Sequence, residues 1–285
     1  MSRSNIGRVL EKIHADTALR DGNGEQNHPQ RQRRFDYEDG VVSRSVEARE
    51  QIRRMHQPFV FTNEEMDARH LVHEGDGNAE VSALLKELRN QITQSHPGLG
   101  ATVLVTSVGA AEQSSVLARN LAAVLAADEN HTSLLLELWD NDSRLTDDEH
   151  RTPGLSEFID SDDLSVGDVI APTGIRRMRT VPFGGVSFVN DEYLRAIRLR
   201  ILIKDVTRRC PRDRFVIIDA PPIDRVLDVA LLNEYADQII VCLPYGKVSI
   251  SEIRKGLGKL ERDKLMGTVL CGAPRLKGFF ERLAK

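Results

Sequence analysis

The sequence has few cysteines, no long apolar run and no excess of positive charge. Its three cysteines, Cys210, Cys242 and Cys271, stand far apart without CxxC spacing, which argues against a disulfide framework and a zinc site and predicts reduced thiols. No apolar run approaches the roughly 18–20 residues of a membrane span, and no signal peptide opens the chain. The net charge of −4 gives no electrostatic case for binding nucleic acid, so we expect a cytoplasmic protein.

The segment that most resembles a nucleotide-binding loop contains no lysine. The stretch TVLVTSVGAAEQSSVLARNLA, from Thr102 to Ala122, has the form of a nucleotide-binding strand, loop and helix. A P-loop uses glycines to turn backbone N–H groups toward phosphates, a lysine for the β and γ oxygens, and a Ser or Thr for magnesium. No lysine lies between Val105 and Leu125, and the loop instead reads Gly109, Ala110, Ala111, Glu112, Gln113, Ser114 and Ser115. The predicted fold of this segment therefore indicates nucleotide binding, whereas its residues do not.

The chain divides by composition into two regions, residues 1–75 and residues 76–285. The run from Asp21 to Gly40 is polar, charged and poor in aliphatic residues, which predicts a flexible linker. Before it, four apolar residues at helical spacing predict a short amphipathic helix that either docks on a partner or membrane surface or packs locally. These residues are Ile6, Val9, Leu10 and Ile13.

The second region alternates helices and strands. Helices are predicted at Glu80–Gln94, Glu112–Ala127, Asp191–Arg209, Val226–Tyr235 and Ser249–Arg262. Strands are predicted at Thr102–Ser107, Ser133–Leu138, Met178–Val181, Arg214–Pro222, Gln238–Pro244 and Gly267–Gly272. Apolar strands without polar alternation indicate a mostly parallel sheet covered on both faces, hence a doubly wound α/β domain. Ligands of such domains bind beyond the carboxyl ends of the strands, where the loop after Thr106 lies.

A second strand adds to the nucleotide-binding pattern. Phe215 to Asp219, FVIID, has the form of a Walker B strand: four apolar residues that end in an aspartate. An aspartate there holds a magnesium-bound water opposite the hydroxyl of the P-loop, which in this chain is Ser115. We therefore assign Ser115 and Asp219 as magnesium ligands in the event that nucleotide binds.

These segments together resemble the bacterial tyrosine kinases (BY-kinases), a family within the MinD/ParA-like P-loop proteins. TSVGAAEQSSVLARNLA is similar to the family's TSxxPGEGKSTxxxNLA signature, and FVIIDAPPI to its Walker B strand. TPGLSEFI, VPFGG, YADQIIVCLP and MGTVLCG resemble further family elements, so the similarity runs from about Glu80 to Ala273. The resemblance implies a P-loop NTPase fold and a role in exopolysaccharide or capsule synthesis, where these kinases regulate the chain-length and export machinery.

The departures from the family pattern fall on the residues that touch phosphate. Ala111 and Gln113 replace loop glycines, Ser114 replaces the phosphate lysine, and Gly109 stands where the superfamily has a further signature lysine. Loss of one such electrostatic donor typically costs about a hundred- to a thousandfold in rate. Glu137 replaces the first aspartate of the motif on the second strand, and the tail GFFERLAK lacks the tyrosine cluster that the kinases autophosphorylate. Two cations, Arg119 and Lys247, are conceivable substitutes for the lysine, but both are better interpreted as surface residues.

We interpret the chain as a catalytically degenerate BY-kinase-like protein that regulates or scaffolds exopolysaccharide synthesis and export. Its expected partners are a membrane chain-length or export protein, through which it reaches the inner membrane, or an active kinase paralogue. The family's oligomer-forming E-x-x-R-x-x-R helix survives only in part, as Glu80, Ala83 and Lys86, so a homo-oligomer is a weaker expectation.

The site assignments follow from this interpretation. No residue is assigned as catalytic, although Asp219 and Glu137 hold the Walker-type positions. Weak or lost nucleotide binding is assigned to Gly109, Gln113, Ser114 and Ser115, so no cofactor is expected and Mg-ATP or ADP is doubtful. The competing hypotheses are enzymatic: a tyrosine autokinase or ATPase with an atypical loop, or a ParA/MinD-like positioning ATPase.

Overall fold

The computed structural model describes residues 55–73, 79–96, 100–109, 112–140, 145–146, 149–185, 191–208, 214–226 and 228–272. The amphipathic helix and linker predicted before residue 55 lie outside the described residues, as do Ala110, Ala111, Cys210 and the C-terminal tail. The described residues thus cover, with gaps, most of the predicted α/β region and the last part of the segment before it.

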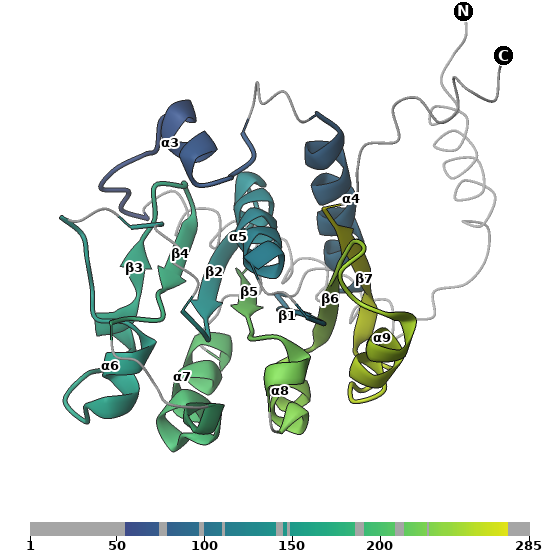
Figure 1. Ribbon diagram of the computed structural model, residues 1–285. Coiled ribbons are helices and arrows are strands. Elements are labelled where there is room, and N and C mark those ends of the chain that lie inside the picture. The colour runs from purple at the N-terminus through teal and green to yellow at the C-terminus, as the bar shows by residue number, and fades with distance from the viewer. Residues whose placement is uncertain are drawn as a thin grey trace, which may run out of the picture. The chain divides into compact units, whose positions relative to one another are not determined.

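The described strands form one mostly parallel sheet (Figure 1). The order across the sheet is β3-β4-β2-β5-β1-β6-β7, with β3 antiparallel to β4 and every other pair parallel. The strands are β1 (Thr102–Ser107), β2 (Thr132–Glu137), β3 (Ala171–Pro172), β4 (Met178–Val181), β5 (Arg214–Asp219), β6 (Gln238–Pro244) and β7 (Leu265–Cys271). This arrangement confirms the predicted doubly wound α/β class.

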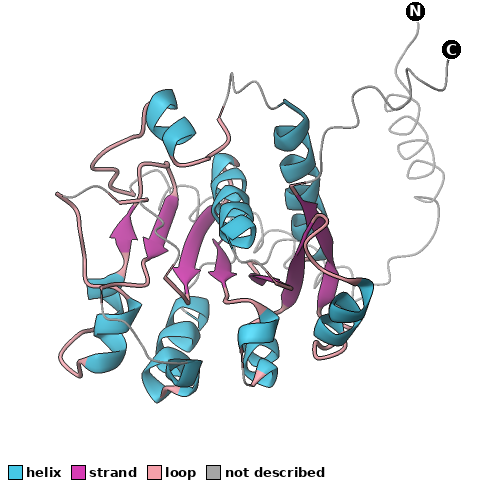
Figure 2. Ribbon diagram, in the orientation of Figure 1, coloured by secondary structure: helices cyan, strands magenta, loops and turns pink. Residues whose placement is uncertain are grey.

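Helices cover both faces of the sheet, as Figure 2 shows. One face carries α4 (Ala79–Ser95) and α5 (Glu112–Ala127), and the other carries α6 (Leu155–Asp160), α7 (Ile197–Arg208), α8 (Val229–Tyr235) and α9 (Ile250–Leu257). Because side chains alternate along a strand, each strand contributes side chains to the cores on both faces of the sheet. On β1, Leu104 packs into the core beneath α7 and α8, while Val103 and Val105 pack into the core beneath α5.

Each predicted helix and strand has a counterpart, but α3 (Asn63–Ala68), α6 and β3 were not predicted, and one predicted helix is divided in two. The predicted helix from Asp191 to Arg209 is a 3-10 helix, η2 (Asp191–Arg195), followed by α7 after Ala196. At this point the hydroxyl of Tyr193 donates a hydrogen bond to the backbone oxygen of Leu138, and its ring packs edge-on against Phe183. The side chain of Tyr193 thus ties this turn to the end of β2.

Residues 55–73, which composition assigned to the N-terminal appendage, pack on the α/β unit. They include α3 (Asn63–Ala68), and Phe61 and Leu71 are buried in the core beneath α5. The backbone N–H of Phe61 donates to the oxygen of Gly174 at 2.9 Å. The α/β unit therefore extends at least as far back as residue 55.

Two of the cysteines are paired, which corrects the prediction of reduced thiols. Cys242 of β6 and Cys271 of β7 form a disulfide, with their Cα atoms 6.3 Å apart. The spacing of 29 residues gave no signal of this pair, because the contact arises from the lateral pairing of two strands. Within the described residues no helix combines the length and the apolar character needed to cross a membrane.

Candidate functional site

The strand ends gather the predicted site residues at the carboxyl edge of the sheet. Glu137 and Asp219 are the last residues of β2 and β5, and they are direct neighbours in the parallel register. Both are buried, with exposed fractions of 3% and 0%. The backbone N–H of Leu138 donates to the carbonyl oxygen of Asp219 at 2.9 Å, which holds the two strand ends together. The two carboxylate residues therefore lie side by side at the carboxyl edge, with Asp219 opposite Val105 of β1.

That loop is held from the opposite side by an acidic residue. Gly109 has a φ of +85°, and its backbone N–H donates to Oδ1 of Asp224 at 2.9 Å. Asp224 belongs to the short 3-10 helix η3 (Ile223–Arg225), which follows β5. A Cβ on Gly109 would come within 2.7 Å of Cγ1 of Val248. Gly109 is thus fixed in a left-handed conformation, and its backbone N–H group is committed to a carboxylate.

The first turn of α5 completes this edge. Ser114 and Ser115 are fully or almost fully buried, and Oγ of Ser115 has no hydrogen-bond partner among the described residues. Gln113 is half-buried, and Oε1 of its side chain likewise lacks a partner within the described part of the chain. Its Nε2 lies 2.8 Å from the position that a Cβ on Gly272 would take, at the end of β7. The Gln113 side chain therefore reaches across the loop toward β7.

Comparison with known proteins identifies relatives in sequence. No protein-family model matches the chain. The tyrosine-protein kinase CpsD of Streptococcus agalactiae is 26% identical over 171 residues, which cover 58% of this chain and 72% of that protein. The CpsD protein of Streptococcus pneumoniae is 27% identical over 182 residues, covering 63% and 73% respectively. The chain is thus similar in sequence to bacterial tyrosine kinases.

Solved structures of bacterial tyrosine kinases share its fold. The kinase domain of the Escherichia coli tyrosine kinase ETK matches with a TM-score of 0.59 and 20% identity, over 76% of this chain and 89% of that one. The BceF tyrosine kinase domain matches with a TM-score of 0.53 and 23% identity, over 69% and 77%. The observed sheet and its flanking helices are thus those of the kinase domains.

The two cations considered as substitutes for the phosphate lysine lie in different environments. Lys247 is exposed, as predicted from its residue type. Arg119 is only 9% exposed, so its assignment to the surface was wrong. It lies one helical turn beyond Ser115 on α5, a helix that is covered by the sheet, by α4 and by residues 70–72. Burial by these neighbours, which are distant in sequence, explains the difference.

Two further elements of the BY-kinase resemblance meet in space. Residues 152–159, TPGLSEFI, and residues 181–185, VPFGG, are joined by backbone bonds from Leu155 and Ser156 to the oxygens of Pro182 and Phe183, at 2.8 and 2.7 Å. Glu157 closes the contact by accepting the backbone N–H of Gly185 at 2.8 Å. These motifs therefore have a structural role beside the sheet.

Asp224 is the residue that sequence reasoning missed. It lies five positions after Asp219, in the APPID segment, and nothing in its sequence neighbourhood separates it from an ordinary surface acid. Only the adjacency of β1 and β5 brings it to Gly109.

The three residues of the partial oligomerisation motif, Glu80, Ala83 and Lys86, are exposed on α4.

Proposed function

We propose that this chain is a non-catalytic member of the bacterial tyrosine-kinase family, which regulates or scaffolds exopolysaccharide (capsule) synthesis and export. The observation that carries the proposal is the hydrogen bond from the backbone N–H of Gly109 to the carboxylate of Asp224, at 2.9 Å. An N–H group that would face phosphate in a working loop faces an anion that belongs to the protein itself. The carboxylate of Asp224 therefore occupies the place that a phosphate oxygen would take on this N–H group.

The residues of this loop do not fit a nucleoside triphosphate. Asp224 places a negative charge at the loop, and no lysine stands in the loop to offset it. Two like charges about 4 Å apart repel by about 1 kcal/mol in water and about 4 kcal/mol near a protein surface. Gln113 adds a side chain where the family has glycine. Phosphoryl transfer depends almost wholly on positioning and electrostatics, so both changes oppose it.

The pathway and the partners rest on the family. Two streptococcal relatives are tyrosine-protein kinases, and the resemblance of this chain to BY-kinases implies the exopolysaccharide setting. The partner is a membrane chain-length or export protein, which brings this chain to the inner membrane, or an active kinase paralogue. Retention of the sheet, of both cores and of the exposed face of α4 supports a role exercised through the protein surface.

Calorimetric titration with Mg-ATP and with Mg-ADP tests the loss of nucleotide binding. We expect no heat of binding up to millimolar nucleotide, at a protein concentration sufficient to detect a dissociation constant of that order. Tight, magnesium-dependent binding with release of ADP would overturn the proposal.

A genetic experiment in the native host separates a scaffold from an enzyme. Deletion of the gene should reduce the yield or shift the chain length of the exported polysaccharide. Replacement by the Ser115→Ala or Asp219→Asn variant should leave the polymer as in the wild type, because neither side chain then has a catalytic task. The proposal fails if a stably expressed Asp219→Asn variant reproduces the deletion.

One observation favours a second candidate, an ATPase or autokinase with an atypical loop. Ser115, Glu137 and Asp219 remain buried at the carboxyl edge, where a magnesium-bound nucleotide would require them. The titration above discriminates between the two, because this candidate requires turnover that the Ser115→Ala substitution abolishes. A ParA/MinD-like positioning ATPase would in addition require dimers that form only with nucleotide.

A further inference from the structure

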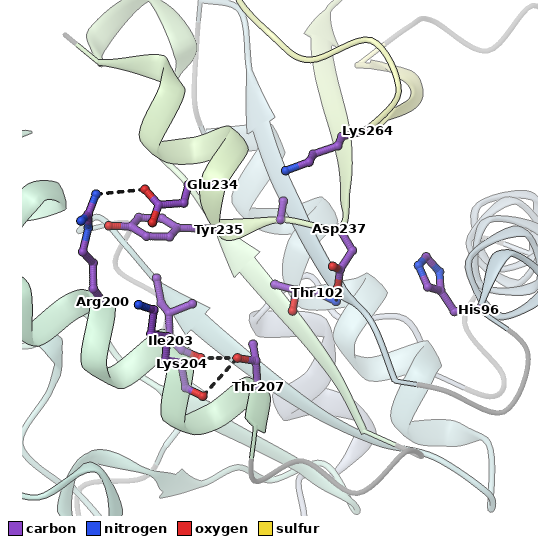
Figure 3. Close-up of a pocket in the computed structure, with 11 residues that line it drawn as sticks. His96, Thr102, Arg200, Ile203, Lys204, Thr207, Glu234, Tyr235, Asp237 and Lys264 are labelled. Atoms are coloured by element: carbon purple, nitrogen blue, oxygen red, sulfur yellow. Dashed lines mark hydrogen bonds and ion pairs between the residues drawn. The ribbon is translucent and has the colours of Figure 1, made fainter.

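A polar cavity opens at the amino edge of the sheet, the edge opposite the loop of Gly109. Its volume is about 480 Å³. It is lined by Thr102 at the start of β1, by Asp237 just before β6, by residues of α7 and the end of α8, and by His96 just after α4 (Figure 3). The size is within the range of about 300–1,000 Å³ that is usual for small-molecule sites.

Three cations line this cavity. Arg200 and Lys204 lie one turn apart on α7, and Lys264 immediately precedes β7 (Figure 3). Nη2 of Arg200 pairs with Oε2 of Glu234 at 2.9 Å, while its buried Nε has no hydrogen-bond partner among the described residues. Lys204 is exposed to the cavity mouth, whereas Nζ of Lys264 donates to the backbone oxygen of Asn233 at 2.7 Å. Cationic side chains from two separate elements therefore line the cavity.

Two carboxylates and a phenol complete the polar lining. Oδ2 of Asp237 accepts the backbone N–H of Thr102 at 2.8 Å, and the N–H of Asp237 donates back to the oxygen of Thr102 at 2.9 Å, which fixes this carboxylate in place. Glu234 is held by Arg200. The hydroxyl of Tyr235 donates to the oxygen of Leu194 at 2.7 Å, and burial raises the pKa of Tyr235, so the phenol adds no negative charge at neutral pH.

The balance of charge and hydrogen-bonding groups indicates the ligand. The described lining carries Arg200, Lys204 and Lys264 against Glu234 and Asp237. Arg200 pairs with Glu234, and Lys264 also pairs with Glu261 at 3.4 Å, whereas Lys204 is exposed at the cavity mouth. Arginine and lysine are the side chains that bind phosphate groups, and a carboxylate oxygen accepts hydrogen bonds from hydroxyl groups. A purely apolar ligand would leave these groups unpaired. We propose that this cavity binds a small hydroxylated organic phosphate, with the phosphate toward Arg200 and Lys204 and the hydroxyl groups toward Glu234 and Asp237.

The site is independent of the proposed function. It lies at the other end of the strands from Asp219 and requires neither the presence nor the absence of nucleotide at the carboxyl edge.

Titration of the full chain with three probes tests the proposal. The probes are inorganic phosphate, glucose 6-phosphate and glucose, each titrated by calorimetry with nucleotide absent. We expect glucose 6-phosphate to bind at least tenfold more tightly than either inorganic phosphate or glucose. The Lys204→Glu variant should weaken the binding of glucose 6-phosphate at least tenfold, and Lys255→Glu, an equivalent change on the exposed face of α9, should not.

Each contrary result would overturn a specific part of the proposed phosphate site. Absence of binding for both phosphates up to 10 mM, about a hundredfold above an ordinary metabolite affinity, overturns the site. Equal affinity for inorganic phosphate and glucose 6-phosphate overturns the role of the carboxylates. Equal weakening by Lys204→Glu and Lys255→Glu assigns the effect to net charge alone and overturns the site as well. Lys204 is exposed, so its variant is expected to fold, and a matching thermal melt verifies this.

Discussion

Asn120 accepts a hydrogen bond from the backbone N–H of Val72, 48 residues earlier in the chain, at 2.7 Å. Its amide nitrogen donates to the oxygens of His70 and Val116, at 2.7 and 2.9 Å. A residue of the NLA part of the loop signature thus fastens the segment before α4 to the side of α5. Within the described structure its hydrogen bonds are to protein backbone.

Replacement of Asn120 by alanine should therefore lower stability. The side chain is 4% exposed, and its loss leaves the N–H of Val72 and the oxygen of His70 without their partner. We expect a loss of about 2–6 kcal/mol in the free energy of unfolding, since each of the two orphaned groups costs about 1–3 kcal/mol. Urea unfolding followed by circular dichroism measures it. Gln91→Ala, on the exposed face of α4, is the control and should stay within about 0.5 kcal/mol of wild type.

A methyl group at position 154 should be poorly tolerated. A Cβ on Gly154 would lie 2.4 Å from both Cα and N of Gly184, which are backbone atoms that cannot rotate away. We expect Gly154→Ala to destabilise the protein by at least about 1–3 kcal/mol, the usual range for overpacking. The matched control is Gly267→Ala in β7, where a Cβ meets nothing within 4 Å. Equal melting temperatures for the two variants would contradict the close contact between residues 154 and 184.

The carboxylate of Glu157 should make stability depend on pH. Burial raises the pKa of Glu157, but hydrogen bonds from the N–H groups of Gly185 and Gly154 and from the hydroxyl of Ser156 outweigh it, and the pKa is lowered overall. A carboxylate with a folded-state pKa below its unfolded value of about 4.3 stabilises the fold above that pH. The stabilisation is lost as the pH falls through the folded-state pKa.

The Glu157→Gln variant tests this dependence. It should lose about 1–2 kcal/mol relative to wild type at pH 7, because charge-assisted hydrogen bonds are replaced by neutral ones. The two proteins should converge as the pH falls below about 4, the unfolded-state pKa of a glutamate. Urea unfolding at pH 7 and at pH 3 measures both differences, with the exposed Glu129→Gln as the control. A difference that is the same at both pH values would show that charge plays no part.

A grafted loop should recover nucleotide binding. The variant Ala111→Gly, Gln113→Gly, Ser114→Lys and Asp224→Ala restores the family's glycines and lysine and removes the carboxylate that accepts the N–H of Gly109. We expect magnesium-dependent ATP binding in the micromolar to millimolar range, measured by calorimetry, where the wild type shows none. Retention of Asp224 in an otherwise identical graft should weaken that binding. A folded graft that binds no ATP would place the defect elsewhere in the chain.

The sequence predicted best what is determined locally. The helix from Glu112 to Ala127 is rich in alanine and leucine, and its predicted bounds are those of α5. The position of Asp219 at the end of a buried strand could be read from four apolar residues and an acid. The helix α3 was missed although Thr62 and Glu65 form a capping box, a signal that the sequence does contain.

Contacts between strands distant in sequence could not be predicted in this way. Asp224 reaches Gly109, and Cys242 reaches Cys271, only because their strands are neighbours in the sheet. Arg119 is buried on α5, a helix that packs against α4 and residues 70–72. The usual exposure of arginine does not predict this burial. Each of these depends on the order of the strands or the packing of helices, and no local pattern carries that information.

Gly109 also constrains the evolutionary future of the loop. The superfamily's early signature lysine would have to stand at this position, where φ is +85° and a Cβ would meet Val248 at 2.7 Å. Every side chain other than that of glycine is strained there, so a single codon change toward lysine would first damage the fold. A loop of the family type is thus separated from the present one by a barrier of backbone geometry as well as by missing residues. Selection could not restore it one substitution at a time without passing through a less stable protein.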